Sequence, residues 1–300
     1  VLNWHMTEAC NYSCRYCYAV WKAQEGSRPR ELIHDSNAVV RLLQELYRFF
    51  RPMNTANPFA GQLTWSSVRL NLAGGEPLLN EERLATIVRV AREIGFEVSL
   101  ISNASRLTPH ILTQLVPQLS WLGLSIDSVT RHTNQLIGRL DRRGKQLDVS
   151  ALAQALHRVR QHQQGMQLKV NTVVNHYNQA EYLGDCIRML APDKWKILRV
   201  LPVVTDGLVV SERGFKDFVN RHAEFRSIMV VEDNDDMRES YLMIDPHGRF
   251  FQNSGRAPGE GYIYSRPILE VGAEAAIASL PFSVERFRSR YIVGGPGGVA

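Results

Sequence analysis

Three of the four cysteines in this 300-residue chain lie within eight positions near its start: Cys10, Cys14 and Cys17. Thiolates bind soft or borderline metals, so a zinc site, a disulfide pair and an iron–sulfur cluster are the candidates. A structural zinc site needs a fourth ligand, but Cys186 lies in an apolar helical pattern typical of a buried free cysteine. Three thiolates without a fourth favour a [4Fe–4S] cluster with one iron open to an added ligand.

Polar residues also end three further apolar stretches. The stretch 68–74 runs into Gly74, Gly75, Glu76 and Pro77. Two glycines let the backbone approach a ligand closely, and the carboxylate of Glu76 can accept a hydrogen bond from a cation. Short polar side chains end the next two stretches in the same way: Ser102, Asn103, Ser125 and Asp127. At the carboxyl ends of neighbouring strands, such side chains converge on one pocket.

Short apolar runs alternate with amphipathic stretches over the first two-thirds of the chain. The runs predict strands at 2–8, 68–74, 97–102, 121–127, 168–175 and 196–204. The amphipathic stretches predict helices at 35–50, 81–95 and 148–160. This alternation indicates a parallel sheet with the helices outside and the strand carboxyl ends on one rim, where such folds place their chemistry. Six units are too few for an eight-stranded barrel, so we predict an α/β fold of the partial (βα)6 barrel type.

The pattern changes after residue 210. A helix is predicted at 213–225, followed by a hairpin that turns at Pro246, His247 and Gly248. The last seven residues are glycine-rich and predict a flexible tail. We therefore divide the chain into a barrel at 1–210 and a C-terminal extension at 211–300.

Composition narrows the classes of function. Apolar residues make up 44% of the chain, enough for a globular core without disulfides. The formal charge of +5, from 35 basic and 30 acidic residues, fits an anionic ligand but is too small to indicate nucleic-acid binding. Scarce, clustered cysteines and the lack of a long apolar run or a signal-type leader predict a cytoplasmic protein without a membrane partner. We expect a monomer.

The stretch CNYSCRYCY resembles the cysteine motif of the radical S-adenosylmethionine (SAM) superfamily, including the aromatic Tyr16 before the third cysteine. The resemblance implies that Cys10, Cys14 and Cys17 hold three irons of a [4Fe–4S] cluster and that the methionine part of SAM chelates the fourth. In that family the reduced cluster cleaves SAM to a 5′-deoxyadenosyl radical, which removes hydrogen from an unactivated carbon. The GGEP element is implied to hold the SAM amino group. The implied SAM contacts are therefore Tyr16, Gly74, Gly75, Glu76, Pro77, Ser102, Asn103, Ser125 and Asp127.

Segments along nearly the whole chain, from about residue 3 to 293, resemble one family within that superfamily, the viperins. They include NLAGGEPLL, NQLIGR, KVNTVVNHYN, KWKILRVLPV, SYLMIDPHGRF and ILEVGAEAAI, in the family's order. Viperins dehydrate a nucleoside triphosphate to its 3′-deoxy-3′,4′-didehydro form, which terminates polymerase chains. The resemblance implies an anti-phage role, a substrate among CTP, UTP and GTP, and a small flavodoxin-like or ferredoxin-like electron donor.

A triphosphate needs several cations or backbone donors in its pocket. Lys169 is the sharpest candidate, because an unpaired charge on an apolar strand is costly unless an anion meets it. Tyr241 matches a viperin tyrosine and is predicted to relay an electron or a proton. Arg290 precedes the glycine-rich tail, which we expect to close over the nucleotide and exclude water. The complete set of predicted nucleotide contacts is Asn134, Arg139, Arg143, Lys145, Lys169, Asn171, Lys196 and Arg290.

Two other functions remain open at this point. A radical SAM enzyme that matures or activates a peptide commonly carries extra cysteines for auxiliary clusters, and this chain has none to spare. A nucleotide sensor with a structural metal would keep the basic loop at 138–145 but would need neither an open iron nor the GGEP element. SAM cleavage that depends on a nucleotide would separate the enzyme from both.

Overall fold

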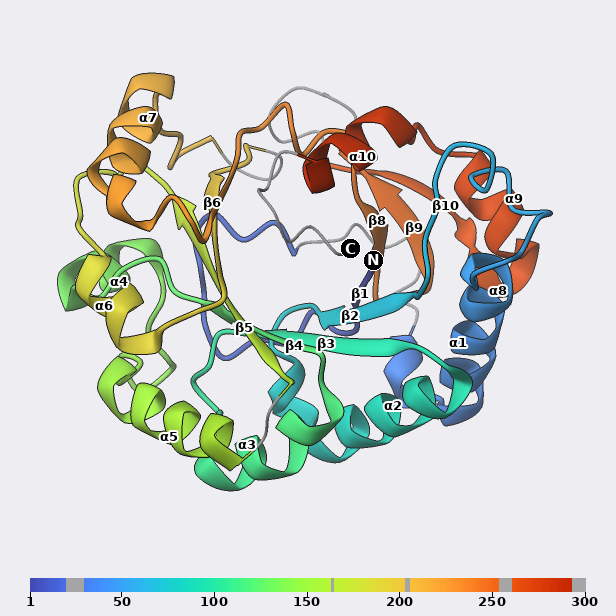
Figure 1. Cartoon of the computed structure of the whole chain (residues 1–300), viewed down its shortest axis with the longest axis horizontal. Coiled ribbons are helices and arrows are strands. Elements are labelled where there is room, and N and C mark those ends of the chain that lie inside the picture. Colours follow the sequence, from blue (N-terminus) through green and yellow to red (C-terminus); the bar gives the residue numbers. More distant parts are fainter. Residues whose placement is uncertain (20–29, 163–164, 203–205, 254–260, 293–300) are drawn as a thin grey trace.

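The computed structural model describes residues 1–19, 30–162, 165–202, 206–253 and 261–292. One sheet of ten strands runs through it, in the order β10-β9-β8-β1-β2-β3-β4-β5-β6-β7. The six strands that come first in the chain, β1 to β6, are parallel neighbours. The sheet curves around an interior, with helices outside it (Figure 1). The six strands are β1 (Leu2–His5), β2 (Arg69–Ala73), β3 (Glu97–Ser102), β4 (Trp121–Ser125), β5 (Gln167–Val174) and β6 (Lys194–Arg199). The six predicted strands and the partial barrel are confirmed.

Helices follow the strands as the alternation predicts. Those between β1 and β6 are α1 (Ser36–Phe50), α2 (Glu81–Ile94), α3 (Pro109–Leu115), α4 (Arg131–Ile137), α5 (Val149–His162) and α6 (Gly184–Leu190). Short 3-10 helices lie at η1 (Leu32–His34), η2 (Pro77–Asn80) and η3 (Val116–Gln118). The Asp35 carboxylate begins α1 by accepting from the backbone N–H groups of Asn37 and Ala38, both at 3.0 Å. Gly95 ends α2 with φ at +119°, a conformation that favours glycine.

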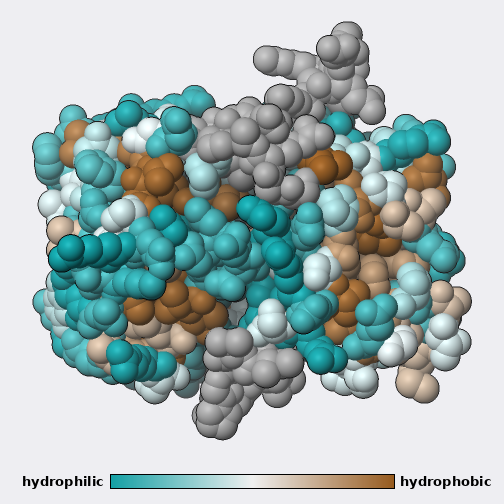
Figure 2. Space-filling model, turned by 90° about the horizontal axis from the view of Figure 1, so that it is seen from above, coloured by the Kyte–Doolittle hydropathy of each residue, from teal (hydrophilic) through white to brown (hydrophobic). Residues whose placement is uncertain are grey.

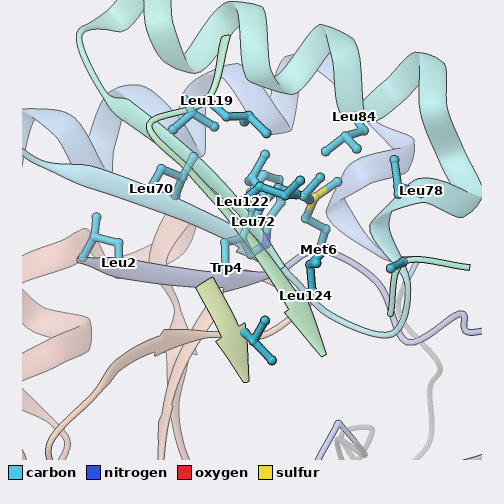
Figure 3. Packing of buried hydrophobic residues seen from close by; sticks show 14 of the residues in the cluster. Leu2, Trp4, Met6, Leu70, Leu72, Leu78, Leu84, Leu119, Leu122 and Leu124 are labelled. Carbon is cyan, nitrogen blue, oxygen red and sulfur yellow. The ribbon is translucent and has the colours of Figure 1, made fainter. Parts of the chain in front are cut away.

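The outward face of the sheet forms the core. Leu2 and Trp4 of β1, Leu70 and Leu72 of β2, and Leu122 of β4 point the same way and are at most 1% exposed. They pack with Leu84 of α2 and Leu119 between the sheet and its helices (Figure 3). Truncating a large buried side chain such as Trp4 to alanine costs about 3–5 kcal/mol in proteins generally, so this layer fixes the barrel wall.

The inward face of the same strands is polar. Asn3, Asn71 and Ser99 lie side by side across β1, β2 and β3. The Asn71 amide donates to the Asn3 side-chain oxygen at 2.9 Å, and the Ser99 hydroxyl donates to Asn71 at 2.8 Å. Side chains alternate between the two faces of a strand, so each strand offers apolar residues to the helices and polar residues to the interior. The barrel interior is therefore built to meet polar groups.

The C-terminal extension continues this sheet at both edges. Its strand β7 (Met229–Glu232) lies parallel to β6, and β8 (Leu242–Ile244) lies parallel to β1. The antiparallel pairing of β8 with β9 (Arg249–Gln252) confirms the predicted hairpin at 246–248. The remaining elements are α7 (Glu212–Arg221), η4 (Ala223–Phe225), β10 (Ile263–Pro267), α8 (Ile268–Val271), α9 (Ala273–Ala278) and α10 (Val284–Ile292). The sheet does not break at residue 210.

Hydrophilic residues dominate the face of the molecule seen in Figure 2, with hydrophobic residues in separate patches. Within the described part of the chain, no helix is both long and apolar enough to cross a bilayer. The predicted glycine-rich tail at 294–300 and the end of the sixth predicted strand, 203–204, lie outside the described residues.

Candidate active site

The three clustered cysteines lie in the loop that follows β1, at the carboxyl ends of the strands. Cys10, Cys14 and Cys17 are partly buried free thiols. Burial raises the pKa of all three thiols, that of Cys14 to about 12. A metal would bind them as thiolates and displace the protons.

The donor set fits a cluster better than a single ion. Among the described residues, no three His, Cys, Asp or Glu side chains are grouped as one metal ion would require. A [4Fe–4S] cluster is larger than one ion and takes each thiolate on a different iron, so its cysteines need not meet at one point. The loop offers three soft sulfur donors to such a cluster.

Gly74 and Gly75 are required by contact with the cysteine loop. The Gly75 backbone N–H donates to the Thr7 carbonyl at 2.7 Å, and the Glu76 N–H donates to the Ala9 carbonyl at 2.8 Å. A Cβ on Gly75 would lie 2.2 Å from the Ala9 oxygen, and one on Gly74 would lie 2.7 Å from the Thr7 oxygen. The observed close approach is therefore between two backbone segments, where the sequence suggested an approach to a ligand.

Glu76 ties this corner to the end of β3. Its carboxylate is fully buried and accepts from the Ser102 hydroxyl at 2.8 Å, the Asn103 N–H at 2.7 Å and the Leu78 N–H at 3.1 Å. Burial raises the pKa of Glu76, and these donors oppose that rise. Asn103 in turn directs its side-chain amide at Cys10 Sγ, 3.8 Å away. Glu76, Ser102, Asn103 and the first cysteine are thus one connected group.

Asp127 and Arg139 form a buried ion pair beside the same loop. The Arg139 guanidinium lies 2.9 Å from the Asp127 carboxylate and also donates to the Ser125 carbonyl. The Tyr16 hydroxyl donates to Asp127 as well. The other oxygen of Asp127 accepts from the Val173 N–H at 2.7 Å. These bonds connect the cysteine loop to the ends of β4 and β5.

A second polar site occupies the barrel interior, toward the amino ends of the strands. It is a cavity of about 130 Å³. Four of the predicted functional residues line it: Lys169, Lys196, Tyr241 and Arg290. Its other described lining residues are Val1, Asn3, Arg69, Asn71, Ser99, Trp121, Lys194, Val230 and Glu232. One acid therefore faces five basic side chains.

Crowded, buried cations shape the electrostatics of this cavity. Burial, reinforced by the positive charges of Lys196, Arg69 and Lys194, lowers the pKa of Lys169 to about 7. Burial also lowers the pKa of Lys196 to about 8, although Glu232 opposes the change. Burial alone would raise the pKa of Glu232, but Lys196 and Arg290 hold it at about 2. Lysines whose charge is disfavoured in this way are stabilised by an added anion.

Comparison with known proteins decides the family. Residues 4–190 match the radical SAM superfamily. The S-adenosylmethionine-dependent nucleotide dehydratase of Pseudoalteromonas ulvae is 41% identical over 291 residues, which cover 97% of this chain and 92% of that protein. The chain belongs to the radical SAM nucleotide dehydratase family. A relative of the same name from Psychrobacter lutiphocae is 40% identical over 97% of this chain and 94% of that protein.

Membership of this family confirms several predictions. The chain is a radical SAM enzyme, and its cofactors are a [4Fe–4S] cluster and SAM. The solved structure of native anSMEcpe with bound AdoMet superposes with a TM-score of 0.60 over 98% of this chain and 83% of that one. At 11% identity this likeness shows the radical SAM fold alone. The alternative of a nucleotide sensor with a structural metal is ruled out by the superfamily match.

Four predicted nucleotide contacts are not brought into the interior cavity. Arg139 is held by Asp127, and the Asn134 side-chain amide donates to the Ser128 carbonyl at 3.0 Å. Arg143 and Lys145 are exposed, and their backbone N–H groups donate to the Asp141 carboxylate at 2.9 and 2.7 Å. Asp141 and Lys145 of this loop line a separate pocket with Tyr12 of the cysteine loop and Ser105 after β3, so the loop lies at the carboxyl rim and not at the interior cavity.

Asn171 lies one step from the cavity. It is paired in register with Lys196 of β6 and Ser125 of β4, and it is 9% exposed. Sequence reasoning missed the cavity's other polar residues. The sequence signal for them was a polar residue between apolar neighbours within a strand: Asn3 in LNWH, Asn71 in RLNLA and Ser99 in EVSLIS.

Proposed function

We propose that this enzyme dehydrates a nucleoside triphosphate to its 3′-deoxy-3′,4′-didehydro form. The observation that carries the proposal is the cationic cavity inside the barrel, lined by Lys169, Lys196 and Arg290. A triphosphate supplies several negative charges, whereas Glu232 is the one acidic side chain among the described residues that line the cavity. The relatives that cover nearly the whole chain are named nucleotide dehydratases.

The residues at the carboxyl rim are proposed to hold the cofactors. Cys10, Cys14 and Cys17 bind the cluster. The GGEP segment and the polar strand ends bind SAM, through Gly74, Gly75, Glu76, Pro77, Ser102, Asn103, Ser125, Asp127 and Tyr16. Support comes from the connected hydrogen bonds that place Glu76, Asn103 and Cys10 in one group. Arg139 serves there by fixing Asp127 and Tyr16.

The interior residues are proposed to hold the substrate. Lys169, Lys196 and Arg290 bind the phosphates, and Asn171, one step beyond the cavity toward the carboxyl rim, binds the ribose or a phosphate. In this proposal the substrate lies along the interior face of a strand, over about three inward-facing residues. Its phosphates lie at the cations, and its ribose lies toward the cysteine loop at the rim. The C-terminal extension at 211–300 completes this pocket, because Tyr241 and Arg290 come from it.

The reaction removes one hydrogen atom from the ribose 4′ carbon and the hydroxyl from the 3′ carbon. When bound, the cluster and SAM supply the 5′-deoxyadenosyl radical that takes the hydrogen atom. One electron is needed to cleave SAM, a second to reduce the substrate radical, and one proton to release the hydroxyl as water. We propose that Tyr241 lies on the path of the second electron or the proton. Its hydroxyl accepts from the Lys196 ammonium group and donates to Glu232.

The remaining expectations follow from this role. The electrons come from a small flavodoxin-like or ferredoxin-like protein, and the enzyme acts as a cytoplasmic monomer. The product lacks the 3′ hydroxyl that polymerases extend, so it terminates viral nucleic-acid chains and protects against phage. CTP, UTP and GTP are the candidate substrates.

The test is an anaerobic incubation of reconstituted protein with SAM, dithionite and one nucleoside triphosphate at a time. We expect 5′-deoxyadenosine and a nucleotide lighter by one water, with one of the three bases strongly preferred. Both products should be measured by mass spectrometry against a reaction that lacks SAM. SAM cleavage that proceeds equally without any nucleotide, and yields no dehydrated product, would contradict the proposal.

A further inference from the structure

Glu232 places a carboxylate among the cations of the interior cavity. It is the last residue of β7, paired in register with Leu198 of β6, and its side chain is 5% exposed. It is the one acidic side chain among the described residues that line the cavity. A pocket that served only to attract a polyanion would gain from an uncharged residue at this position.

Three functional side chains meet at this carboxylate. The Lys196 Nζ lies 2.7 Å from Glu232 Oε1, and the Arg290 Nε lies 3.3 Å from the same oxygen. The Tyr241 hydroxyl donates to the other oxygen. The Arg290 guanidinium carbon also lies 3.3 Å from the centre of the Tyr241 ring. Glu232 thus connects β6, the segment before β8, and α10.

These contacts have two opposite consequences for a bound triphosphate. Glu232 holds three long or rotatable side chains in one arrangement. Because they are already ordered, they lose less conformational entropy when the substrate binds. Its negative charge also shares Lys196 and Arg290 with the phosphates and repels them. A residue of this kind lowers affinity while it improves the geometry of the reacting groups.

We infer that Glu232 is a positioning residue that aligns Tyr241, Lys196 and Arg290 for the dehydration and weakens nucleotide binding in exchange. The inference rests on the proposed function, since it assumes that the cavity holds the triphosphate. Glu232 touches no reacting atom, so its effect should be seen in how completely SAM cleavage leads to product. Replacing Glu232 should allow SAM to be cleaved without a matching yield of dehydrated nucleotide.

The test compares reconstituted wild type with Glu232→Gln, which keeps the shape of the side chain and a hydrogen-bond acceptor but removes the charge. We expect the nucleoside triphosphate to bind about tenfold more tightly. We expect the ratio of dehydrated nucleotide to 5′-deoxyadenosine to fall about tenfold, because Tyr241 and its neighbours are less firmly held. Equilibrium binding and the product ratio are measured on the same preparation, with iron content and thermal unfolding as checks on the fold.

Glu232→Asp separates charge from geometry and covers the case in which the glutamine variant does not fold. Aspartate keeps the charge but is shorter by one methylene, so affinity should stay within about twofold of wild type while the product ratio falls. Asp233→Asn is the matched control, since Asp233 is the next residue but pairs with Arg199 at 3.2 Å outside the cavity. It should change neither quantity.

The outcomes are distinct. If wild type neither binds nor dehydrates any triphosphate, the proposed function and this inference fall together. If wild type does both and Glu232→Gln binds less tightly, or keeps the wild-type product ratio, the inference alone is overturned. An equal change in Asp233→Asn would also overturn it, because the effect would then not depend on the cavity.

Discussion

The carboxyl rim and the interior cavity of this barrel are built in opposite ways. The rim is local in sequence, because its three cysteines fall within eight positions and GGEP is one continuous segment. The cavity is assembled from seven strands, the segment before β8, and α10, each contributing one or two side chains. The cofactor site can therefore be recognised from short sequence motifs, whereas the proposed substrate site is formed only by the whole fold.

The two regions also treat charge differently. At the rim, ionisable groups are satisfied within the protein: Arg139 pairs with Asp127, and Glu76 accepts three hydrogen bonds. In the cavity, five basic side chains face one carboxylate. Paired groups hold a scaffold in place, while an excess of one charge awaits a ligand of the other.

The largest expected effect comes from the rim. Cys14→Ala should abolish both the iron absorbance of reconstituted protein and SAM cleavage, because a cluster held by two thiolates is not retained. Cys186→Ala is the control, since this cysteine is buried on α6 away from the loop and should leave iron content unchanged. Full iron content and SAM cleavage in the Cys14 variant would remove the cluster from this loop.

The cavity should respond through the substrate instead. Lys169→Met removes a charge while keeping an extended side chain, and should raise KM for the triphosphate about tenfold to a hundredfold, the worth of about 1.5–3 kcal/mol for a charged hydrogen bond. Its cluster spectrum should match wild type. Arg143→Met, in the exposed loop, is the matched control and should change KM little. Equal changes in the two variants would contradict the placement of the substrate in the interior.

Tyr241→Phe should have a narrower effect. The ring and its contact with Arg290 remain, but the hydroxyl between Lys196 and Glu232 is lost. Product should fall at least tenfold relative to 5′-deoxyadenosine, since a group that transfers protons contributes about a hundredfold or more. Unchanged product yield would exclude the relay role.

The sequence predicted the rim more completely than the cavity for a physical reason. The cysteine spacing and the GGEP segment can each be recognised within a short stretch of sequence, although their contact with each other, such as that of Gly75 with Ala9, joins distant parts of the chain. The strands and helices followed from periodicity in the same way. Lys169 was found because a lysine on an apolar strand is conspicuous, but Asn71 and Glu232 are ordinary residues until the sheet closes and brings them together.

The basic loop shows the limit of such reasoning. Arg143 and Lys145 follow β4 in the sequence, and Lys145 lies near Tyr12 at the carboxyl rim, but neither residue lines the interior cavity. Arg139 belongs to the same basic stretch, but its side chain forms a buried ion pair with Asp127. Charge density along the chain does not say which face a loop covers, so only the tertiary structure could separate these residues.

The smallest expected effect is the dependence of nucleotide binding on pH. Lys169 and Lys196, with pKa values of about 7 and about 8, are charged below those values and neutral above them. Affinity for the triphosphate should therefore fall roughly threefold to tenfold between pH 7 and pH 9, where the phosphates are already ionised. Titration calorimetry of wild type and Lys169→Met over this range should show a flatter dependence in the variant. Affinity that rises with pH would contradict the assignment.

The most direct test of the link between the two regions is SAM cleavage with a nucleoside triphosphate compared with the same nucleoside without phosphates. The reconstituted enzyme should form 5′-deoxyadenosine and a dehydrated nucleotide with the triphosphate, and almost none with the nucleoside at equal concentration. A nucleoside that works as well as its triphosphate would show that the interior cations do not recognise the substrate, and would contradict the account.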